Sequence, residues 1–167
     1  MRLDKKYFVW LLPILWMGVI FLFSSQPYDR QDIKPVMNKI IDLSFMERYV
    51  SWISFTYANS EVSVQAIGID RFIEFFIRKG AHFTVFFILM ILFYIALSRT
   101  NRLKLKANLI VSLLLSIAYA VMDEFHQGFT PNRTPYIGDV VIDGSGACVA
   151  GILIYIILKR KRKVHDY

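Results

Sequence analysis

The sequence contains a single cysteine among 167 residues, and it lacks the signatures of several enzyme classes. Cys148 cannot form a disulfide within the chain, and inside an apolar run it is expected to be a small packing residue. No Gly-x-Ser-x-Gly sequence is present, so the nucleophile motif of many serine hydrolases is missing. No two histidines stand four residues apart, so a metal would need ligands from several helices, and we expect none.

Charge is absent from four long stretches that hold most of the apolar residues, at 7–23, 83–97, 107–122 and 144–158. Each is shorter than the roughly 20 residues that cross a hydrocarbon core of about 30 Å, so the spans must extend into their polar flanks. We expect spans at residues 7–24, 79–98, 105–124 and 138–158. The predicted fold class is all-α: a polytopic membrane protein with a four-helix transmembrane bundle, forming one domain over residues 1–167.

Lysine and arginine are distributed unevenly along this pattern. Three precede the first span, four lie in residues 99–106 and five follow Leu158, whereas Arg133 is the only one between the last two spans. Because positive charge is enriched in short cytoplasmic loops, we expect both termini in the cytoplasm and an inner face that attracts anionic membrane lipids. A basic run directly after a span is an orientation signal, so we expect no nucleic-acid partner. Phe23 disfavours signal-peptide cleavage, and the first span is expected to be retained.

The predicted outer loop, residues 25–78, is the least regular part of the chain. Helical spacing of apolar residues over 32–43 indicates a short helix, and the aromatic-rich stretch at 45–57 is suited to the headgroup level. After a break at Gly68, residues 69–77 are amphipathic and are expected to continue into the second span. Such short interfacial helices could cap the bundle or form a lid over a lipid-accessible groove, and the pattern does not choose between these.

Polar residues interrupt the apolar runs at four places, which the topology brings to the outer end of the bundle. They are Ser24, Ser25 and Gln26; Arg78, Lys79 and His82; Asp123, Glu124, His126, Gln127 and Arg133; and Asp139 and Asp143. The plain alternatives are a helix end at the first place and a hydrophilic loop at the third. Since ionisable groups are costly at membrane depth, we expect those at the second and fourth places to face the bundle interior.

The third group contains the residues best suited to proton transfer. Asp123 would share a helical face with His126 and Gln127, so its carboxylate could orient the imidazole and raise its basicity. A histidine beside a carboxylate is the minimum equipment for acid–base chemistry near neutral pH. Arg133 offers a planar fork that suits a phosphate or carboxylate.

The fourth group consists of two aspartates on one face of the last span. Asp139 and Asp143 are four residues apart, and neither can stay ionised cheaply in an apolar setting without nearby cations. The local candidates are Arg78, Lys79 and Arg133. We therefore predict a charge-paired polar cluster. The small residues that follow, from Gly144 to Gly151, are expected to permit close helix packing.

These motifs together resemble the VanZ-like family of bacterial membrane proteins. The first two matching features are Ser-Ser-Gln after the first span and Arg-Lys-x-x-His-Phe at the start of the second. The third is Asp-Glu-Phe-His-Gln at the end of the third span, followed by Pro131 and Arg133, and the fourth is Asp139-x-x-x-Asp143-x-x-Gly146 in the last span. The resemblance implies a multi-pass protein of the bacterial cell membrane that is associated with resistance to the lipoglycopeptide teicoplanin. It supplies no established reaction and no cofactor, and the long outer loop leaves the size of any ligand open.

Two functions from different classes fit these residues, and we favour the first. In the first, the polar site binds a cell-envelope lipid, a lipid-linked precursor or a lipoglycopeptide and contributes to glycopeptide resistance. In the second, an outer-leaflet hydrolase or transferase acts on a lipid-linked phosphate or ester. The catalytic candidates are His126, Asp123, Glu124, His82 and Asp143, and the substrate-binding candidates are Arg133, Lys79, Arg78, Gln127, Ser25, Gln26 and Asp139. A small transporter would need a polar path to the inner face, for which the first and third spans carry no charged lining.

Overall fold

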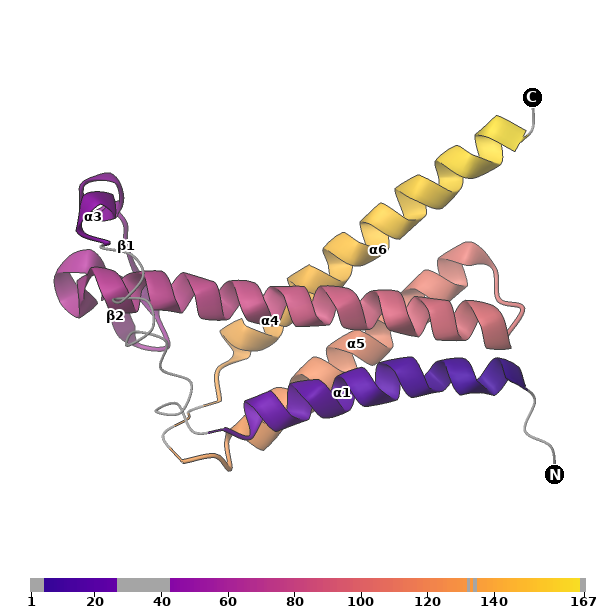
Figure 1. The fold of residues 1–167 in the computed structure, drawn as a ribbon, viewed down its shortest axis with the longest axis horizontal. Helices are drawn as coiled ribbons and strands as arrows, with labels where there is room; N and C mark the ends of the chain where they lie inside the picture. Colours follow the sequence, from indigo (N-terminus) through magenta and orange to yellow (C-terminus); the bar gives the residue numbers. More distant parts are fainter. Residues whose placement is uncertain (1–4, 27–42, 132, 134, 166–167) are drawn as a thin grey trace.

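Four long helices dominate the part of the chain that the computed structural model describes, residues 5–26, 43–131, 133 and 135–165 (Figure 1). The 3-10 helix η1 (Lys5–Trp10) continues into α1 (Leu11–Ser24), and α4 (Val64–Thr100), α5 (Leu105–Gln127) and α6 (Ile137–His165) follow. All four are long and apolar enough to cross a membrane. The predicted all-α polytopic bundle is therefore confirmed.

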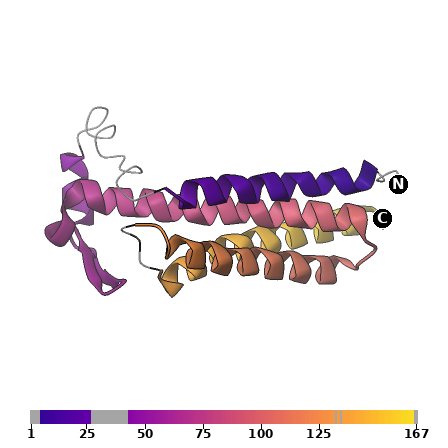
Figure 2. The same ribbon diagram turned by 90° about the horizontal axis from the view of Figure 1, so that it is seen from below.

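Helix α4 is the centre of the bundle. It packs on α6, α5 and α1, and Figure 2 shows α1 on one side of it and α5 and α6 on the other. Large apolar side chains cover the outward surfaces, among them Leu15, Leu114 and Ile152, which are all more than half exposed. Exposed apolar surface of this extent is expected where lipid takes the place of water.

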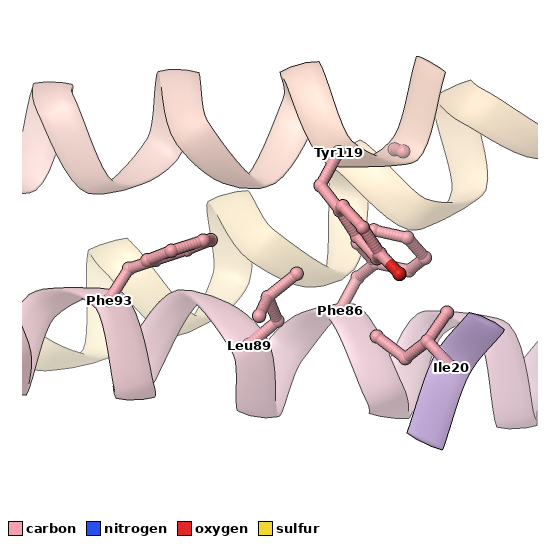
Figure 3. Packing of buried hydrophobic residues seen from close by; sticks show 6 residues of the cluster. Ile20, Phe86, Leu89, Phe93 and Tyr119 are labelled. Atoms are coloured by element: carbon pink, nitrogen blue, oxygen red, sulfur yellow. The ribbon is translucent and has the colours of Figure 1, made fainter. Parts of the chain in front are cut away.

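The interior between α1, α4 and α5 is filled by a small apolar cluster. Ile20, Phe86, Leu89, Phe93 and Tyr119 converge there (Figure 3), and Ala120 completes the cluster. Two polar groups beside this cluster, the Tyr119 hydroxyl and the Trp16 indole N–H, find main-chain acceptors. The Tyr119 hydroxyl donates to the Met17 carbonyl at 2.6 Å, and the Trp16 indole donates to the Val85 carbonyl at 2.9 Å. These bonds tie α1 to its neighbours.

Close packing of α4 on α6 depends on small residues, as the sequence predicted. Ala147 and Ala150 are fully buried, and a Cβ at Gly146 would clash with the backbone of Phe83. Cys148 lies elsewhere: it is exposed, so its predicted role as a packing residue is wrong. Because residues four and seven positions after Asp143 share its helical face, the packed face runs through Ala147 and Ala150 and misses position 148.

Helix α4 begins 15 residues before the span predicted at 79–98. The Ser63 hydroxyl caps it by accepting from the Ala66 N–H at 3.1 Å, and Gly68 kinks it with φ 79° and ψ 159°. The expected break at Gly68 and the continuation of residues 69–77 into the span are confirmed. At 1.5 Å per residue the helix after the kink is roughly 48 Å long, more than the hydrocarbon core of about 30 Å. Its first turns therefore project beyond the bundle (Figure 1).

The connection between α1 and α4 is partly helical, as predicted, and partly not. One short helix, α3 (Ser44–Val50), is present, but residues within the aromatic stretch at 45–57 also form a hairpin of β1 (Ser54–Tyr57) and β2 (Ser60–Ser63). The hairpin reverses at Ala58 and Asn59, which both have positive φ, as a two-residue primed turn requires. Its Val62 packs with Phe72 of α4. Of the helix expected at 32–43, residues 32–42 lie outside the described residues, and Leu43 directly precedes α3.

Candidate functional site

Polar side chains from four elements meet at one end of the bundle, where α1 and α5 end and α6 begins. We call this the polar end. It combines the last residue of α1, the last turn of α5, the first turns of α6 and the middle of α4, so the four polar groups of the sequence are brought together as predicted. The opposite end, where α5 begins, carries Lys104, Lys106 and Lys159 around a shallow pocket, and we call it the basic end.

Asp123 is the centre of a hydrogen-bonded chain that links α1 to the loop before α6. Its Oδ2 accepts from Ser24 Oγ at 2.8 Å and from Gln127 Nε2 at 2.9 Å. Gln127 in turn accepts from Arg133 Nη1 at 2.6 Å. Asp123 is only 2% exposed, so this series of hydrogen bonds connects Arg133 to a buried carboxylate and fixes its position.

The Ser-Ser-Gln segment contributes through its first serine. Ser24 is buried against Asp123, whereas the Ser25 hydroxyl donates to the Phe21 carbonyl at 2.6 Å. Gln26 is exposed. The structure therefore brings neither Ser25 nor Gln26 into the hydrogen-bonded chain, and it brings in Ser24, which the sequence motif also contains.

His126 is not oriented by Asp123, contrary to the geometry predicted for them. Its ring packs on Phe21 with centroids 4.3 Å apart, and within the described residues its Nδ1 is buried without a hydrogen-bond partner. Asp123 Oδ2 accepts from Ser24 and from Gln127, and within the described residues Asp123 Oδ1 is buried without a hydrogen-bond partner, so neither oxygen bonds the imidazole.

Asp139 joins the hairpin to α4 and α6. One of its oxygens accepts from the Tyr57 hydroxyl at 2.5 Å and also from the ammonium group of Lys79. Lys79 Nζ lies 4.6 Å from the centre of the Tyr57 ring, a cation–π distance. Burial and the bond to the Asp139 carboxylate raise the pKa of Tyr57 far above its ordinary value. The predicted charge pairing of Asp139 is confirmed, with Lys79 as the cation.

Tyr57 is a site residue that the sequence did not reveal. It belongs to the aromatic stretch that we assigned to the headgroup level, and its alternation with Phe55 was the only sign of a strand. Its ring makes an edge-on contact with the ring of Tyr136, the residue before α6, with centroids 4.7 Å apart.

The second histidine lies beside the second aspartate. His82 Nδ1 is 3.3 Å from Asp143 Oδ1, a distance that makes an ion pair when the imidazole is protonated. Asp143 is 1% exposed. Arg78 forms an ion pair with Glu74 at 2.6 Å, one turn earlier on α4.

Glu124 has a structural role and a free oxygen. Its Oε1 accepts from the Tyr136 backbone N–H at 2.7 Å, which supports the start of α6. Within the described residues its Oε2 is buried without a hydrogen-bond partner. No group of three or more histidine, cysteine, aspartate or glutamate residues there is arranged to hold a metal ion.

These residues surround a polar pocket of about 240 Å³ at the polar end. Its lining consists of Tyr57, Ala58, Phe75, Arg78, Lys79, His82, Gln127, Arg133, Tyr136 and Asp139. Three permanent cations thus face one carboxylate, which already binds Lys79. Burial and the neighbouring charge of Arg78 lower the pKa of Arg133, so an anion bound beside Arg133 would favour its charged form.

The fold and the pocket define a four-span membrane protein with a cationic polar site at one end. The family model described as VanZ/LLP1 matches residues 8–159, and the chain belongs to this family. No curated protein and no solved structure matches the chain.

Proposed function

We propose that this protein binds an anionic component of the bacterial cell envelope in the polar pocket. The observation that supports the proposal best is the set of three cationic side chains, Arg78, Lys79 and Arg133, that line one small cavity. Phosphate and carboxylate are the groups that such a set recognises, and arginine binds them in a bidentate manner.

Each of the three cations is held by a neighbouring side chain. Glu74 binds Arg78, and Gln127 binds Arg133; of the two, Glu74 is buried outside the pocket lining. Asp139 binds Lys79 from the pocket wall. Side chains that are held in place lose less conformational entropy when a ligand binds, so this arrangement favours recognition of a defined anionic group.

The polar end is proposed to face the outside of the cell. The basic end carries Lys104, Lys106 and Lys159, and α6 ends in the basic run at residues 159–163. Positive charge of this kind is retained on the cytoplasmic side, which would place both termini there. The anionic ligand would then be an envelope lipid, a lipid-linked precursor or a lipoglycopeptide. In line with the family's association with teicoplanin, we propose that binding lowers susceptibility to such glycopeptides.

Binding of an anionic amphiphile tests the proposal. Purified protein in neutral detergent is titrated with dodecyl phosphate, and Arg133→Gln is expected to weaken binding about tenfold, since a charge-assisted hydrogen bond contributes on the order of 1.5 kcal/mol. Lys79→Gln should act in the same direction. Lys106→Gln, a loss of the same charge at the basic end, is the matched control. Equal affinity in all four proteins would refute the proposal.

A second candidate, an outer-leaflet hydrolase or transferase acting on a lipid-linked phosphate or ester, is favoured by His82. This imidazole lines the pocket and lies 3.3 Å from the buried carboxylate of Asp143, a pairing suited to an acid–base group. In the same preparations, release of phosphate from a prenyl diphosphate by the wild type but not by His82→Gln, with dodecyl phosphate binding intact, would support catalysis. Absence of release from the wild type would leave binding as the function.

A further inference from the structure

An apolar groove lies between α1 and α4 at the polar end, with a volume of about 340 Å³. Its lining consists of Trp16, Val19, Ile20, Phe23, Ser24, Arg78, Ala81, His82, Val85 and Arg133. The apolar members come from both helices, and Phe23 is 62% exposed on the outer surface of α1. Both helices are candidate membrane spans, so the groove borders the lipid phase.

The groove and the polar pocket are adjacent and share three lining residues. Arg78, His82 and Arg133 line both of them. On one side of these three residues lie the remaining polar groups, such as Lys79 and Asp139, and on the other side lie only apolar side chains and Ser24. The polar pocket and the apolar groove therefore meet at a cationic boundary, which consists of Arg78, His82 and Arg133.

We propose that this groove holds an acyl chain of the same ligand whose anionic group occupies the polar pocket. The ligand is then a membrane amphiphile, a lipid or a lipidated glycopeptide, and it reaches the site sideways from the bilayer. The inference rests on the proposed function, because it assumes that the pocket binds the anionic group. It adds the chemistry of the remainder of the ligand and the route by which the ligand arrives.

The charge pattern selects this occupant over a helix of another protein or a second copy of the chain. A protein helix would have to present an anionic side chain at the cationic boundary as well as an apolar face to the groove. An acyl chain with an anionic head satisfies both parts at once. Since lipid tails are as apolar as the groove, the position of the chain is set by the head group and by fit, not by the hydrophobic effect.

Trp16 lies in the groove and reports directly on what occupies it. The chain has three tryptophans, so Trp10→Phe with Trp52→Phe leaves Trp16 as the only one. In phosphatidylcholine nanodiscs that contain a few mole per cent of brominated lipid, we expect brominated phosphatidylglycerol to quench Trp16 roughly twice as strongly as brominated phosphatidylcholine. A twofold ratio corresponds to a difference in binding free energy between the two lipids of well under 1 kcal/mol, which one ion pair can supply.

Filling the groove should remove this preference. Ala81→Phe places a phenyl ring in it from α4, and Val19→Phe does so from α1, which guards against a folding defect in either variant. Ala118→Phe is the matched control, because Ala118 is exposed on α5 and is not part of the groove lining. The two groove variants should show equal quenching by both lipids, and the control should keep the wild-type ratio.

The outcomes separate this inference from the proposed function. If Arg133→Gln weakens dodecyl phosphate binding but Trp16 shows no preference, or keeps it in both groove variants, the head group binds without a chain in the groove and the inference is wrong. If neither Arg133→Gln nor Lys79→Gln weakens dodecyl phosphate binding, the proposed function fails and the inference fails with it. A preference that is lost in Arg133→Gln and in both groove variants supports both.

Discussion

Tyr57 and Lys79 donate to the same carboxylate oxygen of Asp139, and this shared acceptor connects three elements that are far apart in the sequence. Membrane-depth acids and bases were predictable as site residues because an ionised group in an apolar setting needs a partner. Their pairings were not predictable. Asp139 had three candidate cations, and only the packing of α4 on α6 determines that Lys79 is the one.

The Tyr57 contact gives the hairpin a pH-dependent attachment. Its phenol is partly buried and lies beside a carboxylate, and both oppose ionisation, so its folded-state pKa is raised. The stabilisation is complete below about pH 10, the ordinary pKa of tyrosine, and is lost as the pH rises above that value. We expect Tyr57 to remain un-ionised beyond pH 10, measured as the difference in phenolate absorbance between the wild type and Tyr57→Phe.

Asp139→Asn is the informative control for this titration. It keeps the shape of the side chain and removes its charge, so Tyr57 should ionise at a lower pH than in the wild type. An unchanged titration in Asp139→Asn would mean that burial alone suppresses the ionisation, which would contradict a role for the carboxylate.

At the scale of elements, uncharged runs identified the four membrane helices but not their ends. Helix α4 extends to Val64 because aliphatic and aromatic residues at its start pack on the hairpin, and such contacts between separate segments cannot be read from the hydropathy of the uncharged run. The hairpin was missed because only Phe55, Tyr57 and Val62 carry the two-residue alternation, and the Ala-Asn turn is not a typical primed-turn sequence. The small residues of α6 were assigned correctly to a close helix contact, apart from Cys148.

The contact of α6 with α4 makes a specific prediction for Gly146. A Cβ there would clash with the Phe83 backbone, which cannot move without shifting α4. Gly146→Ala is expected to destabilise the protein by about 1–3 kcal/mol, the usual cost of overpacking. Its matched control is Gly144→Ala, where a Cβ would meet Ile117 at an ordinary 3.8 Å and should cost nothing. Thermal unfolding in detergent measures both, and equal melting temperatures would contradict the tight contact.

The whole molecule is polarised, with a mixed-charge site at one end and lysines at the other. The proposed orientation follows from that polarity, and it can be measured by cysteine labelling in intact cells after Cys148→Ser. Ser60 and Arg102 are exposed near opposite ends of α4. An impermeant maleimide should label Ser60→Cys and not Arg102→Cys. Labelling of Arg102→Cys alone would invert the topology and place the site in the cytoplasm.

The attachment of α1 has an evolutionary consequence. Trp16 and Tyr119 both donate to main-chain oxygens, at Val85 and Met17, and such acceptors exist whatever side chain those two positions carry. Substitutions at Met17 and Val85 therefore leave both hydrogen bonds possible. Replacement of Trp16 or Tyr119 removes the hydrogen bond that the side chain donates. Among homologous chains, the indole and the phenol should be retained more strictly than the residues they touch.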